Sequence, residues 1–168
     1  KVDSTVKNRL LFRETLFSSP GMKNYIGGVI LYDETIKQST SSGKKIPELI
    51  SSSGALPGIK VDTGAKTLAN SPEEKITEGL DGLRERLKEY YKLGARFTKW
   101  RGVYSISDEF PSKLSIHSNA HALARYAALV QECGMVPIVE PEVLMDGDHS
   151  AKLCYEKTSE VIKKCFEE

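Results

Sequence analysis

The sequence predicts an α/β protein, and within that class about half of a (β/α)8 TIM barrel. Short apolar strands alternate with helical segments, a pattern that favours a parallel sheet. The predicted strands begin at Ile26, Gly58, Phe97 and Val136, so successive starts lie 32, 39 and 39 residues apart, about one strand–helix unit each. A complete barrel needs eight such units in about 250 residues. Four strands in 168 residues therefore make roughly half of one.

The four predicted strands are short, mainly apolar stretches. An open, doubly wound sheet fits them less well, because Gly27-Gly28 lies inside a strand and no GxGxxG or Walker sequence follows any strand. We expect one incomplete barrel domain over residues 1–168, without an internal linker or repeat. The strands are expected at Ile26–Leu31, Gly58–Val61, Phe97–Trp100 and Val136–Glu140.

The helices are predicted from residues that share a face. In Leu80–Leu93, the side chains of Leu83 and Leu87 lie on one face, and Gly94 ends the helix. Further helical patterns are expected at Asn8–Phe17, Ser118–Cys133 and His149–Phe166, and loops at Ser39–Lys45 and Thr63–Thr77.

The composition excludes classes of protein more than it identifies one. The chain carries 24 basic and 23 acidic residues, and this balance gives no indication of a nucleic-acid or acidic-membrane partner. No apolar run approaches a membrane span, and no signal sequence opens the chain. Three cysteines without a CxxC pair favour a reducing compartment and no disulfide framework.

Charged residues at three strand ends are the main indication of a functional site. Lys99 and Arg101 are two residues apart, so their side chains leave the same face of a strand. A buried unpaired ammonium is costly, and a fold tolerates it mainly where an anion or carboxylate meets it. Each charge alone is as consistent with a structural ion pair as with a site. Two further strand ends carry the same pattern: Lys60 with Asp62, and Glu140 with Glu142.

Metal sites are weakly indicated. His117 and His121 have the spacing of helical metal ligands, but the glutamate of HExxH is missing and His117 is expected to precede the helix. Asp146-Gly-Asp-His149 is similar to part of a calcium loop and lacks its later ligands. We expect neither a metal nor another cofactor. Trp100, between the two cations, is expected to face the other way and pack under a helix.

Six motifs, in order and in spacing, closely resemble class I fructose-1,6-bisphosphate aldolase. The family is a (β/α)8 barrel, usually a cytoplasmic homotetramer, that reversibly cleaves fructose 1,6-bisphosphate to dihydroxyacetone phosphate and glyceraldehyde 3-phosphate through a lysine imine. The resemblance implies a sugar-phosphate substrate and no metal. The motifs are Gly27-Gly-Val-Ile-Leu-Tyr-Asp-Glu-Thr35, Gly58-Ile-Lys-Val-Asp-Thr-Gly64, Gly79-Leu-Asp-Gly-Leu83, Phe97-Thr-Lys-Trp-Arg101, Leu123-Ala-Arg-Tyr-Ala127 and Val136-Pro-Ile-Val-Glu-Pro-Glu142.

The resemblance also assigns roles to individual residues. It makes Glu140 the general acid and base, and Lys99 the residue that binds the centre of the substrate's carbon chain and helps to polarise it. Glu142 is expected to orient Lys99. Three cations are expected at the substrate phosphates: Lys60, Arg101 and Arg9.

The resemblance covers strands two to five of the family's barrel. Asp3-Ser4-Thr5 superficially echoes a motif of the first strand, but it precedes Asn8-Arg9 and receives no role. The imine-forming lysine of the family lies in a Leu-Leu-Lys-Pro-Asn motif, expected beyond Glu168. This fragment alone is therefore expected to be inactive. A non-catalytic phosphosugar-binding or scaffold protein and a different phosphosugar barrel remain alternatives, and the preference between fructose 1,6-bisphosphate and fructose 1-phosphate stays open.

Overall fold

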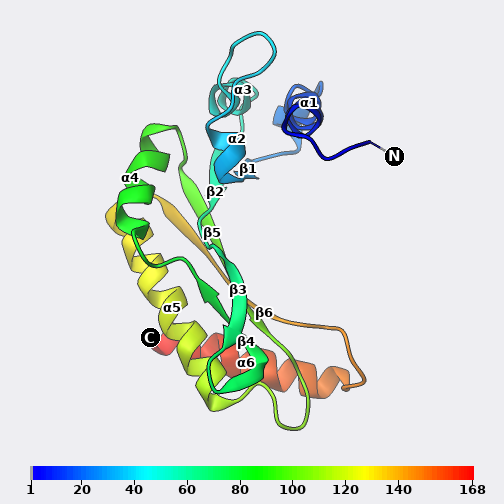
Figure 1. Ribbon diagram of the computed structural model, residues 1–168, viewed down its shortest axis with the longest axis vertical. Coiled ribbons are helices and arrows are strands. Elements are labelled where there is room, and N and C mark those ends of the chain that lie inside the picture. Colours follow the sequence, from blue (N-terminus) through cyan, green and yellow to red (C-terminus); the bar gives the residue numbers. More distant parts are fainter. Residues whose placement is uncertain (1) are drawn as a thin grey trace.

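The computed structural model describes residues 2–168. Its main sheet has four strands in the order β1-β2-β5-β6, and every neighbouring pair is parallel. Figure 1 shows the helices that connect them packed along the sheet. The strands are β1 (Gly28–Leu31), β2 (Leu56–Lys60), β5 (Phe97–Tyr104) and β6 (Val136–Val143).

Three of the helices begin at a residue whose side chain caps the helix. The hydroxyls of Thr5, Ser112 and Ser150 each accept a hydrogen bond from a backbone N–H three residues on. No helix in residues 2–168 has the length and apolar character needed to cross a membrane. The helices are α1 (Val6–Phe17), α2 (Asp33–Ile36), α3 (Ile46–Ser52), α4 (Leu83–Lys92), α5 (Lys113–Glu132) and α6 (Ala151–Glu167), with a 3-10 turn at Met22–Asn24.

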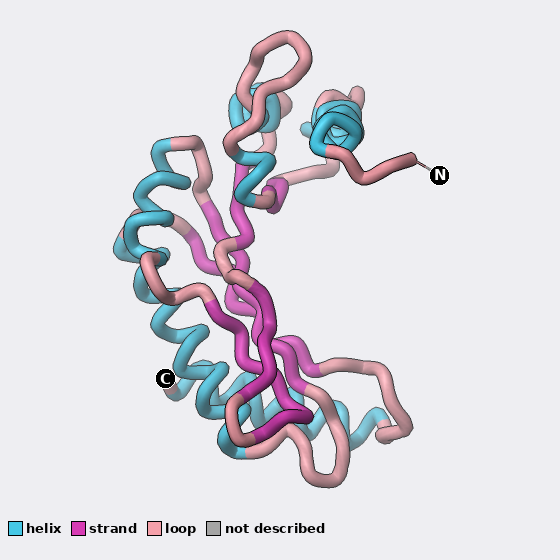
Figure 2. The backbone as a smooth tube through the Cα atoms, viewed as in Figure 1, coloured by secondary structure: helices cyan, strands magenta, loops and turns pink. Residues whose placement is uncertain are grey.

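The core lies between the sheet and the helices that run along one side of the strands (Figure 2). Trp100 is fully buried, and its ring lies 5.4 Å from that of Tyr126 on α5. Ile59 of β2 and Leu87 of α4 belong to the same buried cluster. The expectation that Trp100 packs under a helix is confirmed.

The region expected to be a loop at Thr63–Thr77 contains two strands. β3 (Gly64–Leu68) and β4 (Ser71–Glu78) form an antiparallel hairpin, separate from the main sheet. Its sequence is mostly polar because most of its side chains are exposed. Asn70 makes the turn with φ at 65°, a conformation that asparagine adopts more readily than most residues.

Several element boundaries also differ from those expected. β5 and β6 each continue three or more residues past their predicted ends, through Arg101 and Glu142. Helix α5 begins at Lys113, and the prediction that His117 precedes the helix was wrong. Ser112 supplies the cap that starts α5 one turn earlier.

Candidate active site

Alternation along β5 sends its cations to one face of the sheet. Thr98, Trp100 and Gly102 are buried on the side of α5, and the Thr98 hydroxyl lies 2.6 Å from the hydroxyl of Tyr126. These contacts hold the strand from behind. Lys99 and Arg101 therefore project from the opposite face.

Each of these cations meets a carboxylate from the neighbouring strand. The Nζ of Lys99 lies 2.7 Å from an Oε of Glu140, and an Nη of Arg101 lies 2.9 Å from an Oε of Glu142. In the strand register Lys99 lies opposite Ile138 and Arg101 lies opposite Glu140. Each cation therefore contacts the carboxylate two residues beyond the β6 residue that faces it. The family resemblance predicts that Glu142 orients Lys99. In the structure Glu142 contacts Arg101, and Glu140 contacts Lys99, because both pairs follow the same diagonal.

Lys60, the last residue of β2, joins this row from the other side of β5. Its backbone lies directly opposite Lys99 in the register. Its Nζ donates to Asp62 Oδ1 at 2.5 Å and to the carbonyl of Asp62 at 3.2 Å. The Asp62 side chain is only 3% exposed, so Lys60 contacts a carboxylate that is largely shielded from water.

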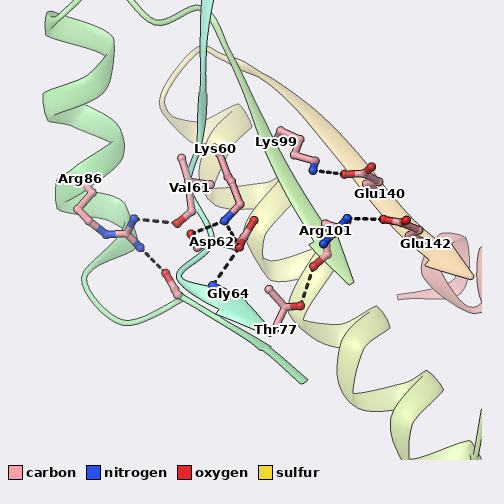
Figure 3. A network of polar contacts seen from close by, with 11 residues as sticks. Lys60, Val61, Asp62, Gly64, Thr77, Arg86, Lys99, Arg101, Glu140 and Glu142 are labelled. Carbon is pink, nitrogen blue, oxygen red and sulfur yellow. Dashed lines mark hydrogen bonds and ion pairs between the residues drawn. The ribbon is translucent and has the colours of Figure 1, made fainter. Parts of the chain in front are cut away.

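Figure 3 shows Lys60, Lys99, Arg101 and the two glutamates gathered over the same stretch of adjacent strands. The register gives the reason, since Lys60, Lys99 and Ile138 lie in one transverse row and Glu140 follows two residues after Ile138. The three cations are matched by three carboxylates. An incoming phosphate would therefore compete with an existing carboxylate for each cation it binds.

The arrangement suits the binding of an anionic, multiply charged small molecule with proton transfer beside it. Lys99 and Arg101 retain 20% and 46% side-chain exposure, so both are open to a ligand. The Glu140 side chain is 37% exposed and within hydrogen-bond distance of a cation. Among residues 2–168, no group of three His, Cys, Asp or Glu side chains is placed to hold a metal ion.

Comparisons with known proteins agree with this geometry. A family model described as glycolytic fructose-bisphosphate aldolase class-I matches residues 1–168. The chain belongs to the class-I fructose-bisphosphate aldolase family. A probable class 1 fructose-bisphosphate aldolase of Xanthomonas campestris is 54% identical over 165 residues, which cover 98% of this chain and 49% of that protein. Cytosolic fructose-bisphosphate aldolase 4 of Arabidopsis thaliana is 50% identical, over 98% of this chain and 42% of the relative.

A solved structure shows the same fold. The fructose-bisphosphate aldolase of Plasmodium falciparum, in a ternary complex with TRAP and a small-molecule inhibitor, has a TM-score of 0.97 and 46% identity. The match covers 99% of this chain and 49% of that one. The chain thus spans about half the length of the aldolases it matches. The parallel sheet and this likeness confirm the predicted fold class, a partial (β/α)8 barrel.

Arg9 is the one predicted site residue of this aldolase-family chain that lies on a helix, and it has partners of its own. Its Nη2 and Nε donate to the two Oε atoms of Glu34 at 2.6 and 3.1 Å, and its Nη1 donates to the carbonyl of Ser4. Arg13 donates to the same carboxylate at 2.9 Å. Hydrogen bonds from Arg9, which has the larger effect, and from Arg13 lower the pKa of Glu34 to about 2. The structure therefore places Arg9 in an ion-pair cluster between α1 and α2.

Asp62 and Thr77 are polar residues close to the site to which the sequence analysis assigned no role. Asp62 Oδ1 accepts the backbone N–H of Gly64 as well as the Lys60 ammonium, which ties the start of the β3–β4 hairpin to the site. Thr77 donates its hydroxyl to the carbonyl of Arg101. Asp62 belongs to the pattern of charged strand ends because it lies two residues after Lys60, but the family resemblance gives it no role. Thr77 lay in a predicted loop and offered no signal.

The two histidines with metal-ligand spacing have another partner. His117 and His121 stack with ring centroids 6.2 Å apart, and their Nδ1 atoms lie 3.3 and 3.1 Å from the carboxylate of Glu168. Hydrogen bonds from Lys164, which has the larger effect, and from His121 lower the pKa of Glu168 to about 2. This cluster connects α5 to the end of α6.

Proposed function

We propose that the complete protein containing this chain is a class I fructose-bisphosphate aldolase. It would cleave fructose 1,6-bisphosphate reversibly to dihydroxyacetone phosphate and glyceraldehyde 3-phosphate, as a step of glycolysis and gluconeogenesis. The observation that carries the proposal is the 2.7 Å contact between Lys99 and Glu140 in a chain of this family. Lys99 also lies directly opposite Lys60 in the strand register. The substrate forms an imine with a lysine outside residues 1–168.

The geometry supports the roles as follows. Glu140 is the proton shuttle, because forming an imine and cleaving the bond beside it require proton transfers to and from the carbinolamine and the C4 hydroxyl. Its contact with Lys99 keeps a cation beside the developing charge at the substrate oxygens. Lys60 and Arg101 bind phosphate, since charge-assisted hydrogen bonds from separate strands converge on a bisphosphate.

Glu142 and Arg9 enter the proposal with their observed contacts. Glu142 is 2.9 Å from Arg101, so a phosphate that binds Arg101 would exchange places with the Glu142 carboxylate. Arg9 reaches a substrate phosphate only if it gives up part of its contact with Glu34. Both residues would then be rearranged on binding.

The proposal extends to assembly and location. Residues 1–168 form part of one barrel domain, and the complete protein is a homotetramer in the cytoplasm. The family resemblance supports the tetramer, and relatives from Arabidopsis described as cytosolic support the location. Exposed apolar side chains on the outer strands, such as Ile30 and Val136, support a barrel that continues beyond both edges of this sheet.

Trapping of the imine tests the proposal. The complete protein is incubated with dihydroxyacetone phosphate and borohydride, which reduces an imine to a stable secondary amine. We expect a mass increase on one lysine outside residues 1–168, and none on the isolated chain. Trapping on Lys60 or Lys99 would require a new assignment of the catalytic lysine. If no lysine of the complete protein is trapped while fructose 1,6-bisphosphate still binds, the protein is a phosphosugar-binding protein and the enzymatic proposal fails.

A further inference from the structure

The β3–β4 hairpin fills a gap beside the half of β5 that carries Arg101. β2 ends at Lys60, opposite Lys99, whereas β5 runs on to Tyr104. Beyond Lys99, β5 therefore has a parallel neighbour on one side only, β6. The hairpin packs against this part of β5 on the other side, and Figure 1 shows it beside the lower half of the sheet.

One side chain of the hairpin replaces the missing strand contact. Thr77 is 3% exposed, and its hydroxyl donates to the backbone carbonyl of Arg101 at 2.6 Å, as Figure 3 shows. The backbone N–H of Thr77 donates to Oδ1 of Asn119, which is 1% exposed on α5. The amide nitrogen of Asn119 donates in turn to the carbonyls of Lys75 and Ser115. Asn119 thus holds the backbone of β4 at Thr77 and at Lys75, and this fixes the position from which the Thr77 hydroxyl contacts Arg101.

Arg101 depends on its backbone for direction. Its side chain is 46% exposed, and the one ion pair it makes within residues 2–168 is with Glu142. An exposed ion pair holds a long side chain weakly. The guanidinium therefore lies where the Cα position and strand direction place it. The Cα position and the strand direction at Arg101 are set by the pairing of β5 with β6 on one side and by the Thr77 hydroxyl on the other.

We propose that Thr77 is a positioning residue for substrate phosphate, acting through Arg101. Its hydroxyl holds β5 at Arg101, two residues beyond the row of Lys60 and Lys99, so that the Arg101 guanidinium stays on the same face of the sheet at a fixed distance from these two lysines. The same hairpin is tied to Lys60, because Asp62 accepts both the Lys60 ammonium and the N–H of Gly64. The hairpin thereby sets the spacing between two phosphate-binding cations. This inference rests on the proposed role of Arg101.

The test removes one hydroxyl and measures affinity separately from turnover. In the complete enzyme, Thr77→Val keeps the shape of the side chain and removes the donor. We expect KM for fructose 1,6-bisphosphate to rise about two- to tenfold, which is what the loss of one ordinary hydrogen bond gives. We expect kcat to stay within about twofold, because Glu140 and Lys99 are untouched. Thr77→Ser, which keeps the hydroxyl, should restore KM.

Thr98→Val is the matched control. Thr98 is equally buried on β5, and its hydroxyl also makes a 2.6 Å hydrogen bond, but to Tyr126 on the helix side. It should lower the melting temperature and leave KM unchanged. If Thr77→Val only lowers the melting temperature in the same way, Thr77 is structural and the inference is wrong.

A double variant separates this inference from the function it rests on. If Arg101→Ala alone leaves KM unchanged, the phosphate role of Arg101 fails. If Arg101→Ala raises KM, adding Thr77→Val to it should raise KM no further, because the residue that Thr77 positions is gone. Independent, additive effects would overturn the inference. Should Thr77→Val not fold, Thr77→Cys, which has similar size and a weaker donor, undergoes the same comparisons.

Discussion

The chain holds its arginines and carboxylates together in two different ways. On the sheet, Arg101 meets Glu142 across neighbouring parallel strands, and the same diagonal joins Lys99 to Glu140. Between α1 and α2, Arg9 reaches Glu34 across 25 residues of sequence by side chains alone. On the sheet the backbone register determines which charged side chains meet. Between α1 and α2 the lengths and directions of the side chains determine it.

The difference bears on what each cluster can do. Charges held by register stay in place when a partner leaves, because neighbouring backbone hydrogen bonds keep their Cα atoms fixed. A ligand can therefore displace Glu142 from Arg101 without moving the strand. The Glu34 carboxylate binds two guanidinium groups at once, Arg9 and Arg13, so displacing it breaks both ion pairs that join α1 to α2. We therefore expect the sheet to carry the chemistry and the helix cluster to serve mainly to hold α1.

The largest expected effect is on turnover. In the complete enzyme, Glu140→Gln should lower kcat about 10²–10⁴-fold, the usual contribution of a positioned acid or base, while KM changes little. Glu34→Gln makes the same chemical change in the helix cluster and should leave kcat within about twofold. Steady-state kinetics with fructose 1,6-bisphosphate measure both. A turnover for Glu140→Gln within a few-fold of wild type would rule out its role as proton shuttle, and an equal loss in Glu34→Gln would remove the distinction between the two regions.

A smaller effect is expected on affinity. Arg101→Ala should raise KM about 10- to 100-fold, because a charge-assisted hydrogen bond to phosphate is lost. Arg9→Ala should raise KM by less than about tenfold, since its guanidinium is already bound to Glu34 and to the Ser4 carbonyl. Arg84→Ala, which breaks an exposed pair with Glu132, is the control and should leave KM unchanged. Equal effects of Arg9→Ala and Arg101→Ala would show that Arg9 leaves Glu34 when substrate binds.

The same contrast explains what the sequence could predict. Strand residues were readable because buried parallel strands are apolar runs, and side chains two apart share a face. That reasoning predicts that Lys60, Lys99, Arg101 and Glu140 lie together at the C-terminal ends of adjacent strands, and the structure places all four on the neighbouring strands β2, β5 and β6 (Figure 3). It ends β5 and β6 too early, because a charge is taken as the end of a strand. Arg101 and Glu142 are in fact strand residues, and their side chains form a diagonal ion pair between the neighbouring strands β5 and β6.

Contacts that depend on side-chain reach were not readable. The partner of Arg9 is far away in sequence, and no periodicity connects an arginine on α1 to Glu34. The hairpin was missed for a related reason, because a sheet that is exposed over most of its surface lacks the apolar alternation that reveals a strand. Only Leu68, Glu74 and Thr77 of its two strands are buried, and two of these three are polar.

The smallest expected effect is a dependence of stability on pH that comes from the helix cluster. Hydrogen bonds from Arg9 and Arg13 lower the pKa of Glu34 from 4.5 to about 2 in the folded protein. A carboxyl group whose pKa is lower in the folded state stabilises it fully above the unfolded pKa, and loses that contribution as pH falls through the folded pKa. The stability that Glu34 provides should therefore be constant above about pH 5 and decline from there towards pH 2.

Urea unfolding of the wild type and of Glu34→Gln at a series of pH values measures this contribution. The other acidic groups, including Glu168, titrate alike in both proteins, so the difference in unfolding free energy isolates Glu34. The difference should be small and should shrink in 1 M salt, because the pair is about one-third exposed and accessible to screening ions. A difference that stays constant from pH 7 to pH 2 would show that Arg9 does not hold Glu34 in solution. Arg9 would then be free to bind phosphate in the same way as Arg101, and the contrast between the two regions would no longer hold.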